Sequence, residues 1–422
     1  MIYFVIGTRP EIIKLYPTIM LVEKEGIPYK LIWSGQHYDY EMSRIFFEEL
    51  QIPEPDIYLN IDPEKDITEK LGQIIASLNN VIKNERPNAI YALGDTTTTL
   101  AAAIVAAYNN IPFIHDEAGM RSNDRTMLEE INRIIADRVS TVYFAPTKIA
   151  VANLIREGIT SNIFLTGSTA VDAVLSIKQN GLISAGERRL LQEIYLPESR
   201  TIITVTLHRR ENLAQEKLLN LIKLFYISQY KMPEITYVFP IHPHTKNIMI
   251  KYNLYEKLIK LSNVILTKPL GYLEFLALMN KSDIVITDSG GVQVEAYTLG
   301  KKVITMRSTT EWYETVIMNY NTLVQLENNP EIILKIIRER IGDKTHEVPL
   351  YLSPLGDGQA SLRITKLLIY LYKNKFQYNF YNCLNIYQFS NKEINRLNLN
   401  DILINWYDID NVCYRNILNC SK

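Results

Sequence analysis

The stretch "NAIYALGDTTTTLAAAIVAAYNNIPFIHDEAG", residues 88–119, contains the repeating unit that decides the fold. A short β-rich run, an alanine-rich helical run and a second β-rich run follow one another. This order predicts two parallel strands joined by a crossover helix. Polar side chains follow both predicted strands: Asp95 follows the first, and His115, Asp116 and Glu117 end the second.

The same alternation begins at "MIYFVIG" and restarts at "TIITVT" further along the chain. Two doubly wound α/β domains fit this pattern better than one very wide sheet. We expect the seam within Leu165–Lys178, which gives domains over residues 1–170 and 171–357. Residues 374–422 are richer in Asn, Tyr and Ile and form an appended tail of unknown role. Ligands of such sheets bind beyond the carboxyl ends of the strands, where the polar motifs lie.

Composition excludes several classes of protein. The 422 residues include 45 basic and 46 acidic side chains, so no general field attracts nucleic acid or anionic lipid. Three cysteines without a CxxC motif indicate neither a metal site nor a disulfide framework, which favours a reduced cytoplasmic setting. We expect no signal peptide at the start of the chain, because charge follows very few apolar residues, and no apolar run approaches the roughly 18 residues of a membrane span. We expect a soluble, cytoplasmic protein without a bound metal.

The segment "TDSGGVQVEA", Thr287–Ala296, places glycines where a strand gives way to a helix. Free backbone N–H groups at such a helix start can hold an anion, and a diphosphate is the candidate. Glu295, about one turn further on, can accept hydrogen bonds from ribose hydroxyls. A plain strand-to-helix turn stays open as the alternative. We expect the helix to run to about Leu299 and to end at Gly300.

Other charged residues also follow predicted strands. Arg9 and Lys14 in "GTRPEIIK" could face a pyrophosphate, or each could be a solvated charge. Asp95 is either a helix N-cap or a catalytic group, and capping is the usual role of an isolated Asp. Glu129 and Glu130 begin a helix, where acidic residues usually complement the helix dipole. Three histidines are expected to be structural, namely His242, His244 and His346.

Eleven motifs, taken in order, resemble the non-hydrolysing UDP-N-acetylglucosamine 2-epimerases over residues 1 to about 373. They are "GTRPEIIK", "SGQHYDYEMS", "GDTTTTLAAAIVAAY", "HDEAGMRS", "EEINR", "FAPT", "NLIREGI", "LTGSTAVDAV", "TLHRREN", "GYLEF" and "TDSGGVQVEA". The resemblance implies two Rossmann-like domains of glycosyltransferase B type with a nucleotide in the cleft between them. It also implies a last helix over 358–373 that crosses back to the first domain, a homodimer, and no cofactor.

The implied reaction interconverts UDP-N-acetylglucosamine and UDP-N-acetylmannosamine. Elimination of UDP gives 2-acetamidoglucal, and UDP then adds again with protonation from the other face. By resemblance, Asp95, Glu117 and Glu129 are the acid and base carboxylates, and His208 contacts the diphosphate. The resemblance assigns seven positions to UDP binding, namely Arg9, Lys14, Phe275, Ser289, Gly290, Gly291 and Glu295.

The chain departs from the family pattern in two motifs. Trp312 stands in "TTEWYET" where the family commonly has Arg, which resembles the branch acting on UDP-2,3-diacetamido-2,3-dideoxyglucuronate. That sugar nucleotide is the alternative substrate. Tyr38 and Asp39 follow Gln36 and His37, and Asp66 lies near an expected basic position. Activation by a second substrate molecule is therefore not expected.

Three other functions remain open from the sequence. A glycosyltransferase of the same fold would share the diphosphate site but has no reason to place three carboxylates around C2. An inactive sugar-nucleotide sensor would not need the complete acid–base set. A hydrolysing relative would release UDP and free N-acetylmannosamine, but those enzymes lack the "GTRPE" opening found here.

Overall fold

The computed structural model describes residues 1–35, 47, 50, 52–197, 200–343 and 353–373. The chain divides into two compact units. The first contains residues 1–173 together with the described residues beyond 352, and the second contains residues 174–343. The appended tail, 374–422, lies outside the described residues.

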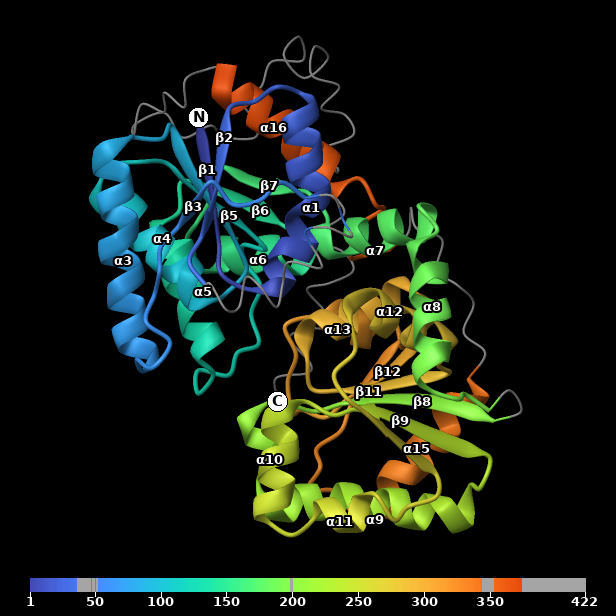
Figure 1. Cartoon of the computed structure of the whole chain (residues 1–422). Helices are drawn as coiled ribbons and strands as arrows, with labels where there is room; N and C mark the ends of the chain where they lie inside the picture. The colour runs from blue at the N-terminus through green and yellow to red at the C-terminus, as the bar shows by residue number, and fades with distance from the viewer. Residues whose placement is uncertain (36–46, 48–49, 51, 198–199, 344–352, 374–422) are drawn as a thin grey trace. The chain divides into compact units, whose positions relative to one another are not determined.

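The first unit is built on a seven-stranded parallel sheet (Figure 1). Its strands are β1 (Ile2–Ile6), β2 (Tyr29–Trp33), β3 (Ile57–Tyr58), β4 (Ala89–Leu93), β5 (Phe113–Asp116), β6 (Val142–Ala145) and β7 (Ile163–Leu165). Its helices are α1 (Arg9–Lys24), α3 (Ile67–Asn84), α4 (Thr97–Tyr108), α5 (Leu128–Val139), α6 (Lys148–Arg156), the start of α7 (Thr169–Gln179) and α16 (Ala360–Lys373). Apolar residues of the sheet and of α3 and α4 form one buried core.

The strand order places a topological switch at the centre of this sheet. The order is β3-β2-β1-β4-β5-β6-β7, so the chain moves outward from β1 in one direction and outward from β4 in the other. Ligands of doubly wound sheets bind beyond the carboxyl ends of the strands at such a switch point. The segments that follow β1, β4 and β5 are therefore the first place to look for a site.

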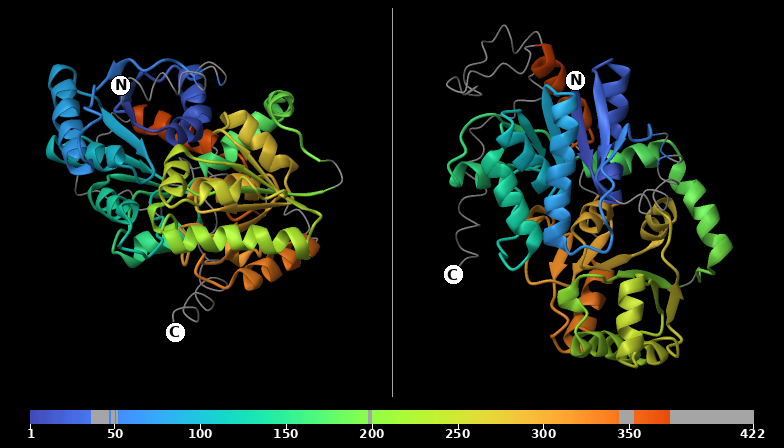
Figure 2. Two further views of the ribbon diagram at one scale, coloured as in Figure 1. Left: turned by 60° about the horizontal axis from the view of Figure 1, so that its bottom comes forward. Right: turned by 60° about the vertical axis from the view of Figure 1, so that its left-hand side comes forward.

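Helix α16 joins the first unit although it follows the whole second unit in sequence. It packs against α1, as the views in Figures 1 and 2 show. The buried carboxylate of Asp172 accepts hydrogen bonds from the backbone N–H groups of Ala360 (3.2 Å) and Ser361 (2.7 Å). These bonds satisfy two of the free N–H groups at the start of α16.

The second unit repeats the architecture with a six-stranded parallel sheet of order β10-β9-β8-β11-β12-β13. Its strands are β8 (Thr201–Thr206), β9 (Ile235–Pro240), β10 (Val264–Thr267), β11 (Ile284–Thr287), β12 (Lys302–Thr305) and β13 (Asn321–Leu323). Its helices are the end of α7, α8 (Leu182–Glu193), α9 (Gln215–Lys231), α10 (Pro243–Lys251), α11 (Tyr255–Leu258), α12 (Tyr272–Lys281), α13 (Gly290–Thr298), α14 (Tyr313–Ile317) and α15 (Pro330–Gly342). The switch point lies between β8 and β11.

The predicted fold class, two doubly wound parallel α/β domains, is confirmed. The change of unit falls between Ala173 and Val174, inside α7. Helix α13 ends at Thr298, and Gly300 follows it with a left-handed φ of 74°, as the sequence predicts. None of the helices in the described parts of the chain combines the length and apolar character that a membrane crossing requires.

Candidate active site

Glu117 follows β5 at the switch region of the first unit and forms an ion pair with Lys14 of α1. The lysine Nζ lies 2.7 Å from Oε1 and 2.9 Å from Oε2 of the carboxylate. Burial alone would lower the pKa of Lys14, but the charge of Glu117 outweighs it, and the pKa lies above its usual value. Lys14 is therefore charged at neutral pH and lies against the Glu117 carboxylate.

The backbone of Glu117 has a φ of 63°, in the left-handed region that side chains other than Gly, Asn and Asp seldom adopt. Its N–H donates to Oδ1 of Asp116 at 2.8 Å. This contact holds the backbone of Glu117, and the Lys14 ion pair holds its carboxylate. Strain of this kind is concentrated at functional sites in proteins.

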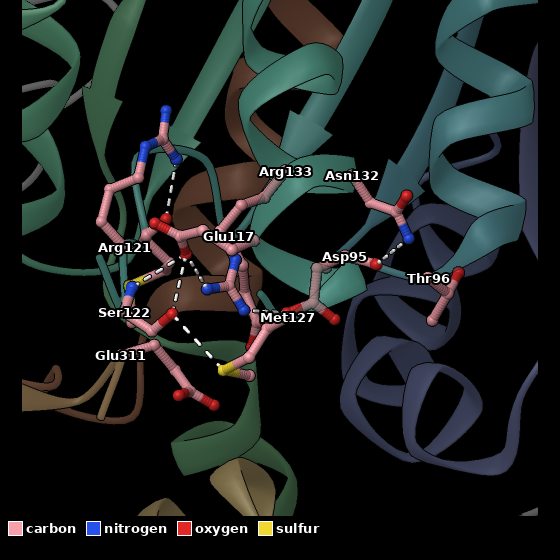
Figure 3. Close-up of polar contacts among 12 residues, drawn as sticks. Asp95, Thr96, Glu117, Arg121, Ser122, Met127, Asn132, Arg133 and Glu311 are labelled. Carbon is pink, nitrogen blue, oxygen red and sulfur yellow. Dashed lines mark hydrogen bonds and ion pairs between the residues drawn. The ribbon is translucent and has the colours of Figure 1, made fainter. Parts of the chain in front are cut away.

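Asp95 follows β4, the strand next to β5, and forms an ion pair with Arg133 of α5 (Figure 3). Asn132 of the same helix donates to the backbone carbonyl of Asp95 at 2.9 Å. The prediction that an isolated Asp here would cap the next helix is wrong. Thr96 is the N-cap of α4, and its hydroxyl accepts from the N–H of Thr99 at 3.2 Å. The side chain of Asp95 is thereby left to pair with a cation.

The two glutamates that begin α5 have different environments. Glu130 is buried, and its carboxylate accepts from the N–H groups of Ser122 (2.9 Å) and Asn123 (3.0 Å) and from Arg133 (2.6 Å). Glu129, the predicted catalytic residue, is partly exposed in the first turn of the helix. Glu130 and Arg133 thus link the start of α5 to the loop at Ser122 and to Asp95. The sequence did not assign this structural role to them.

Two buried hydrogen bonds fix Asp116. The hydroxyl of Tyr91 donates to Oδ2 at 2.7 Å, and the Glu117 N–H donates to Oδ1. Burial raises the pKa of Asp116 to about 7 against the opposing effect of the Tyr91 hydrogen bond, and the charge of Glu117 adds to the rise. The sequence placed Asp116 at the end of this strand but gave it no role.

The start of α1 is occupied by a carboxylate of the chain itself. Glu11 is buried and accepts from the N–H groups of Gly7 (2.9 Å) and Thr8 (2.7 Å) and from the hydroxyl of Thr96 (2.7 Å). Arg9, the first residue of α1, is partly exposed. Of the two cations predicted to face a pyrophosphate, Lys14 is paired with Glu117 in this structure.

In the second unit, α13 begins at Gly290 directly after β11 and Ser289. A methyl group added at Gly291 would have no heavy atom within 4 Å, so its surroundings are open. One added at Gly290 would lie 1.9 Å from Oε1 of Glu311, which forms an ion pair with Arg307 at 2.9 Å. The helix start is therefore open to an added side chain at Gly291 and covered at Gly290.

His208 follows β8, the strand that pairs with β11, and lies against Asp288. The Nδ1 atom is 3.2 Å from Oδ1 of this buried carboxylate, which also accepts from the backbone N–H of Arg209 (2.9 Å) and from Asn212 (3.1 Å). Burial raises the pKa of Asp288, but the hydrogen bond and charge of His208 outweigh it and the pKa is lowered. The ionised Asp288 lies against Nδ1 and orients the imidazole of His208. The sequence did not single out Asp288.

Two predicted UDP contacts, Glu295 and Phe275, lie on helices of the same unit, and Trp312 precedes a third helix. Glu295 of α13 accepts a hydrogen bond from the hydroxyl of Tyr272 at 3.1 Å. Phe275 follows Tyr272 by three residues on α12 and is partly exposed. Trp312 is buried at the start of α14, and its Nε1 lies 3.7 Å from the position of a methyl group added at Gly290.

The remaining predicted residues have structural roles or lie outside the described ranges. Asp66 caps α3 by accepting from the N–H groups of Thr68 (2.8 Å) and Glu69 (2.9 Å). His242 caps α10 by accepting from the His244 N–H at 3.2 Å, so its predicted structural role is confirmed. Four residues named for the activator site and one histidine fall outside the described residues, namely Gln36, His37, Tyr38, Asp39 and His346.

Two parallel-sheet α/β units, each with polar residues after its central strands, define an α/β protein of the glycosyltransferase B-like class. Residues 20–369 match the family model described as UDP-N-acetylglucosamine 2-epimerase. The chain belongs to this family, which places it among the isomerases. Within the described residues, no group of three or more His, Cys, Asp or Glu side chains is arranged to hold a metal ion.

Individual relatives give the extent of the similarity. The UDP-N-acetylglucosamine 2-epimerase of Methanocaldococcus jannaschii is 39% identical over 369 residues, which cover 87% of this chain and 98% of the relative. The UDP-2,3-diacetamido-2,3-dideoxy-D-glucuronate 2-epimerase of Pseudomonas aeruginosa is 35% identical over 370 residues, or 86% of this chain and 98% of the relative.

Solved structures agree with these relationships. The M. jannaschii UDP-GlcNAc 2-epimerase in complex with UDP-GlcNAc and UDP has a TM-score of 0.78 and 38% identity, covering 87% of this chain and 99% of that one. The UDP-GlcNAc 2-epimerase of Neisseria meningitidis bound to UDP-GlcNAc has a TM-score of 0.79 and 33% identity over the same shares of the two chains.

Proposed function

We propose that the chain interconverts UDP-N-acetylglucosamine and UDP-N-acetylmannosamine. The observation that carries the proposal is the placement of two carboxylates, Asp95 and Glu117, after adjacent strands at the switch of the first sheet, each paired with a cation. Relatives named for this activity match this chain over nearly their whole length.

The chemistry explains the need for several carboxylates. The hydrogen at C2 of the sugar has no neighbouring carbonyl, so its direct removal is too costly. In the proposed elimination, a base takes the C2 proton while the electron pair of the C1–O bond leaves with UDP, and a C1–C2 double bond forms. In the return step, a UDP oxygen bonds to C1 and an acid protonates C2 from the opposite face. One base, one acid and cations for the departing UDP are required.

In this scheme Glu117, Asp95 and Glu129 supply the acid and base groups. Lys14 holds the carboxylate of Glu117 in place. Arg133 fixes Asp95, and it is itself held by the buried Glu130. His208, oriented by Asp288, contacts the diphosphate and steadies its departure.

UDP would bind mainly to the second unit. The open surroundings of Gly291 at the start of α13 suit a phosphate, and Ser289 and Gly290 complete that turn. Glu295 would accept from the ribose hydroxyls, and Phe275 would contact the uracil. Arg9 and Lys14 are proposed as the cations near the diphosphate. The resemblance to the family also supports a homodimer.

The second candidate substrate is UDP-2,3-diacetamido-2,3-dideoxyglucuronate. Trp312 and the 35% identity to the P. aeruginosa enzyme of that name favour it. The buried position of Trp312 next to Gly290 gives it a packing role, and an indole supplies no positive charge for a sugar carboxylate. The simpler substrate therefore stands first.

A proton NMR time course in heavy water tests the proposal. Purified protein is incubated with UDP-N-acetylglucosamine alone, without acceptor or cofactor. We expect deuterium at C2 together with UDP-N-acetylmannosamine. Accumulation of free UDP with free N-acetylmannosamine would indicate hydrolysis instead. An unchanged spectrum from folded protein that binds UDP would contradict the first substrate, and the diacetamido-glucuronate would be assayed in the same way.

A further inference from the structure

Asp116 is a buried carboxyl group in direct contact with the backbone of a proposed catalytic residue. Its exposed fraction is 1%. Oδ1 accepts from the N–H of Glu117 at 2.8 Å, and Oδ2 accepts from the hydroxyl of Tyr91 at 2.7 Å. The mechanism proposed above gives this carboxyl no task. Burying an ionisable group is costly, so its presence beneath Glu117 calls for an explanation.

Tyr91 has the apolar setting of a core residue except at its hydroxyl. Its ring centroid lies 4.7 Å from that of Phe4 on β1 and 6.1 Å from that of Phe144 on β6. Tyr91 is fully buried, and its hydroxyl points to Asp116 on the neighbouring strand. Tyr91 and Asp116 therefore form a buried polar contact between β4 and β5, and the aromatic rings of Phe4 and Phe144 pack beside Tyr91.

The charged groups around Asp116 come from several elements. Lys14 of α1 and Asp95 after β4 act on the same cluster, because the charges of Asp95 and Asp116 both raise the pKa of Lys14. His115 precedes Asp116 on β5 and lowers its pKa, whereas Glu117 raises it. Asp116 therefore lies among charges supplied by α1 and by the ends of β4 and β5.

We propose that Asp116 is a positioning residue for Glu117 and stores a proton beside it. The side chain holds the Glu117 backbone in its left-handed conformation, and its own change of protonation state changes the charge beside Glu117. As a role in catalysis, this inference rests on the proposed epimerase function. Its two parts, backbone support and proton storage, can be tested separately.

The geometry tolerates both protonation states of Asp116. Oδ1 accepts from the Glu117 N–H whether or not the other oxygen carries a proton. A tyrosine hydroxyl can donate or accept, so the Tyr91 contact also persists when Oδ2 is protonated. The value of about 7 places this change within the physiological range. Asp116 can therefore gain or lose a proton without releasing Glu117.

The first test compares pH profiles of kcat/KM with UDP-N-acetylglucosamine. Asp116→Asn retains an acceptor for the Glu117 N–H but cannot ionise. We expect the wild-type profile to show an inflection near neutral pH that is absent from this variant. Tyr91→Phe removes a hydrogen bond that lowers the pKa of Asp116, so the inflection should move to higher pH.

Tyr143→Phe is the matched control. It removes another buried tyrosine hydroxyl from the same sheet, one that donates to the carbonyl of Ser140 at 2.7 Å, and the inflection should stay in place. A uniform fall of kcat at every pH in Asp116→Asn, with the inflection retained, would overturn the proton-storage role and leave only backbone support.

A second measurement does not depend on turnover. Infrared difference spectra between wild type and Asp116→Asn across a pH series report the buried carboxylic acid directly. We expect its carbonyl band to disappear near pH 7, and to disappear at lower pH in Glu117→Gln, because the charge that disfavours ionisation is gone. The inference would be overturned if the carbonyl band were absent, or if the pH at which it disappears were the same in Glu117→Gln as in the wild type. If the wild type shows the band and its titration but no turnover of UDP-N-acetylglucosamine, the result would count against the epimerase function and not against the role of Asp116.

Discussion

Glu117 has a conformation that its residue type disfavours, by about 1–3 kcal/mol for a left-handed residue other than glycine. The Asp116 hydrogen bond and the Lys14 ion pair offset this strain in the described structure. A carboxylate held in this way is pre-organised, since its position does not depend on the arrival of a ligand. The same reasoning applies to Asp95, which Arg133 and Asn132 hold from two sides.

Conservative substitution of either carboxylate should separate chemistry from binding. Asp95→Asn and Glu117→Gln keep the size of the side chain but remove the group that exchanges a proton. We expect each variant to lose at least ~100-fold in turnover, the contribution typical of general acid–base catalysis. Calorimetry should find the affinity for UDP nearly unchanged. A large loss of UDP affinity with retained C2 exchange would contradict these roles.

Asp116 also predicts a pH dependence of stability. Its pKa of about 7 in the folded state exceeds that of an unfolded Asp, so the folded state retains the proton over a range in which the unfolded state has lost it. Its contribution to stability is full below pH ~4 and is lost as the pH rises to about 7, with a slope of at most ~1.4 kcal/mol per pH unit.

Urea unfolding at pH 5, 6, 7 and 8 measures this effect. The free energy of unfolding of wild type, relative to that of Asp116→Asn, should fall between pH 5 and 7 and then level off. A constant difference across the series would show that Asp116 is ionised throughout.

The sequence located Asp95 and Glu117 because both follow apolar strands, a pattern that needs no tertiary information. It could not find their partners. Arg133 reaches Asp95 from 38 positions away, and Lys14 reaches Glu117 from 103 positions away. The capping prediction for Asp95 failed for a local reason, since Thr96 is one residue nearer to the helix.

At the scale of elements, the start of α13 offers a contrast between adjacent glycines. A side chain at Gly291 would enter open space, whereas one at Gly290 would meet Glu311. Gly291→Val should therefore leave the fold of the second unit intact and weaken UDP binding at least ~10-fold by blocking the phosphate. Calorimetric titration with UDP measures the loss, and circular dichroism checks the fold. Unchanged UDP affinity would contradict the phosphate site.

Elements were predicted more completely than their contacts. The alternation of β-rich and helical runs was sufficient to find the strands on both sides of each switch, because a parallel buried strand is a short apolar run. The anchoring of α16 by Asp172 was not foreseen, because the two lie 188 residues apart and nothing local in either segment indicates the other.

At the scale of the whole molecule, ligand binding should not stabilise the two units equally. The proposed contacts with uracil, ribose and the helix start all belong to the second unit. UDP at 100 times its Kd should raise the free energy of unfolding by about 2.7 kcal/mol, chiefly in that unit. Hydrogen exchange followed by mass spectrometry can assign the protection to segments. Gly291→Val is the control, and stronger protection of β4 and β5 than of α13 would contradict the assignment.

The position of α16 also has a consequence for synthesis of the protein on the ribosome. Helix α1 is made first, but the helix that packs against it begins at Ala360, after the whole second unit. The ribosome must add the 186 residues from 174 to 359 in between, which takes about 10–40 s at 5–20 residues per second. During that interval the apolar face of α1 has no partner from α16, so the nascent first unit presents a surface that chaperones can bind, while the second unit is completed without interruption.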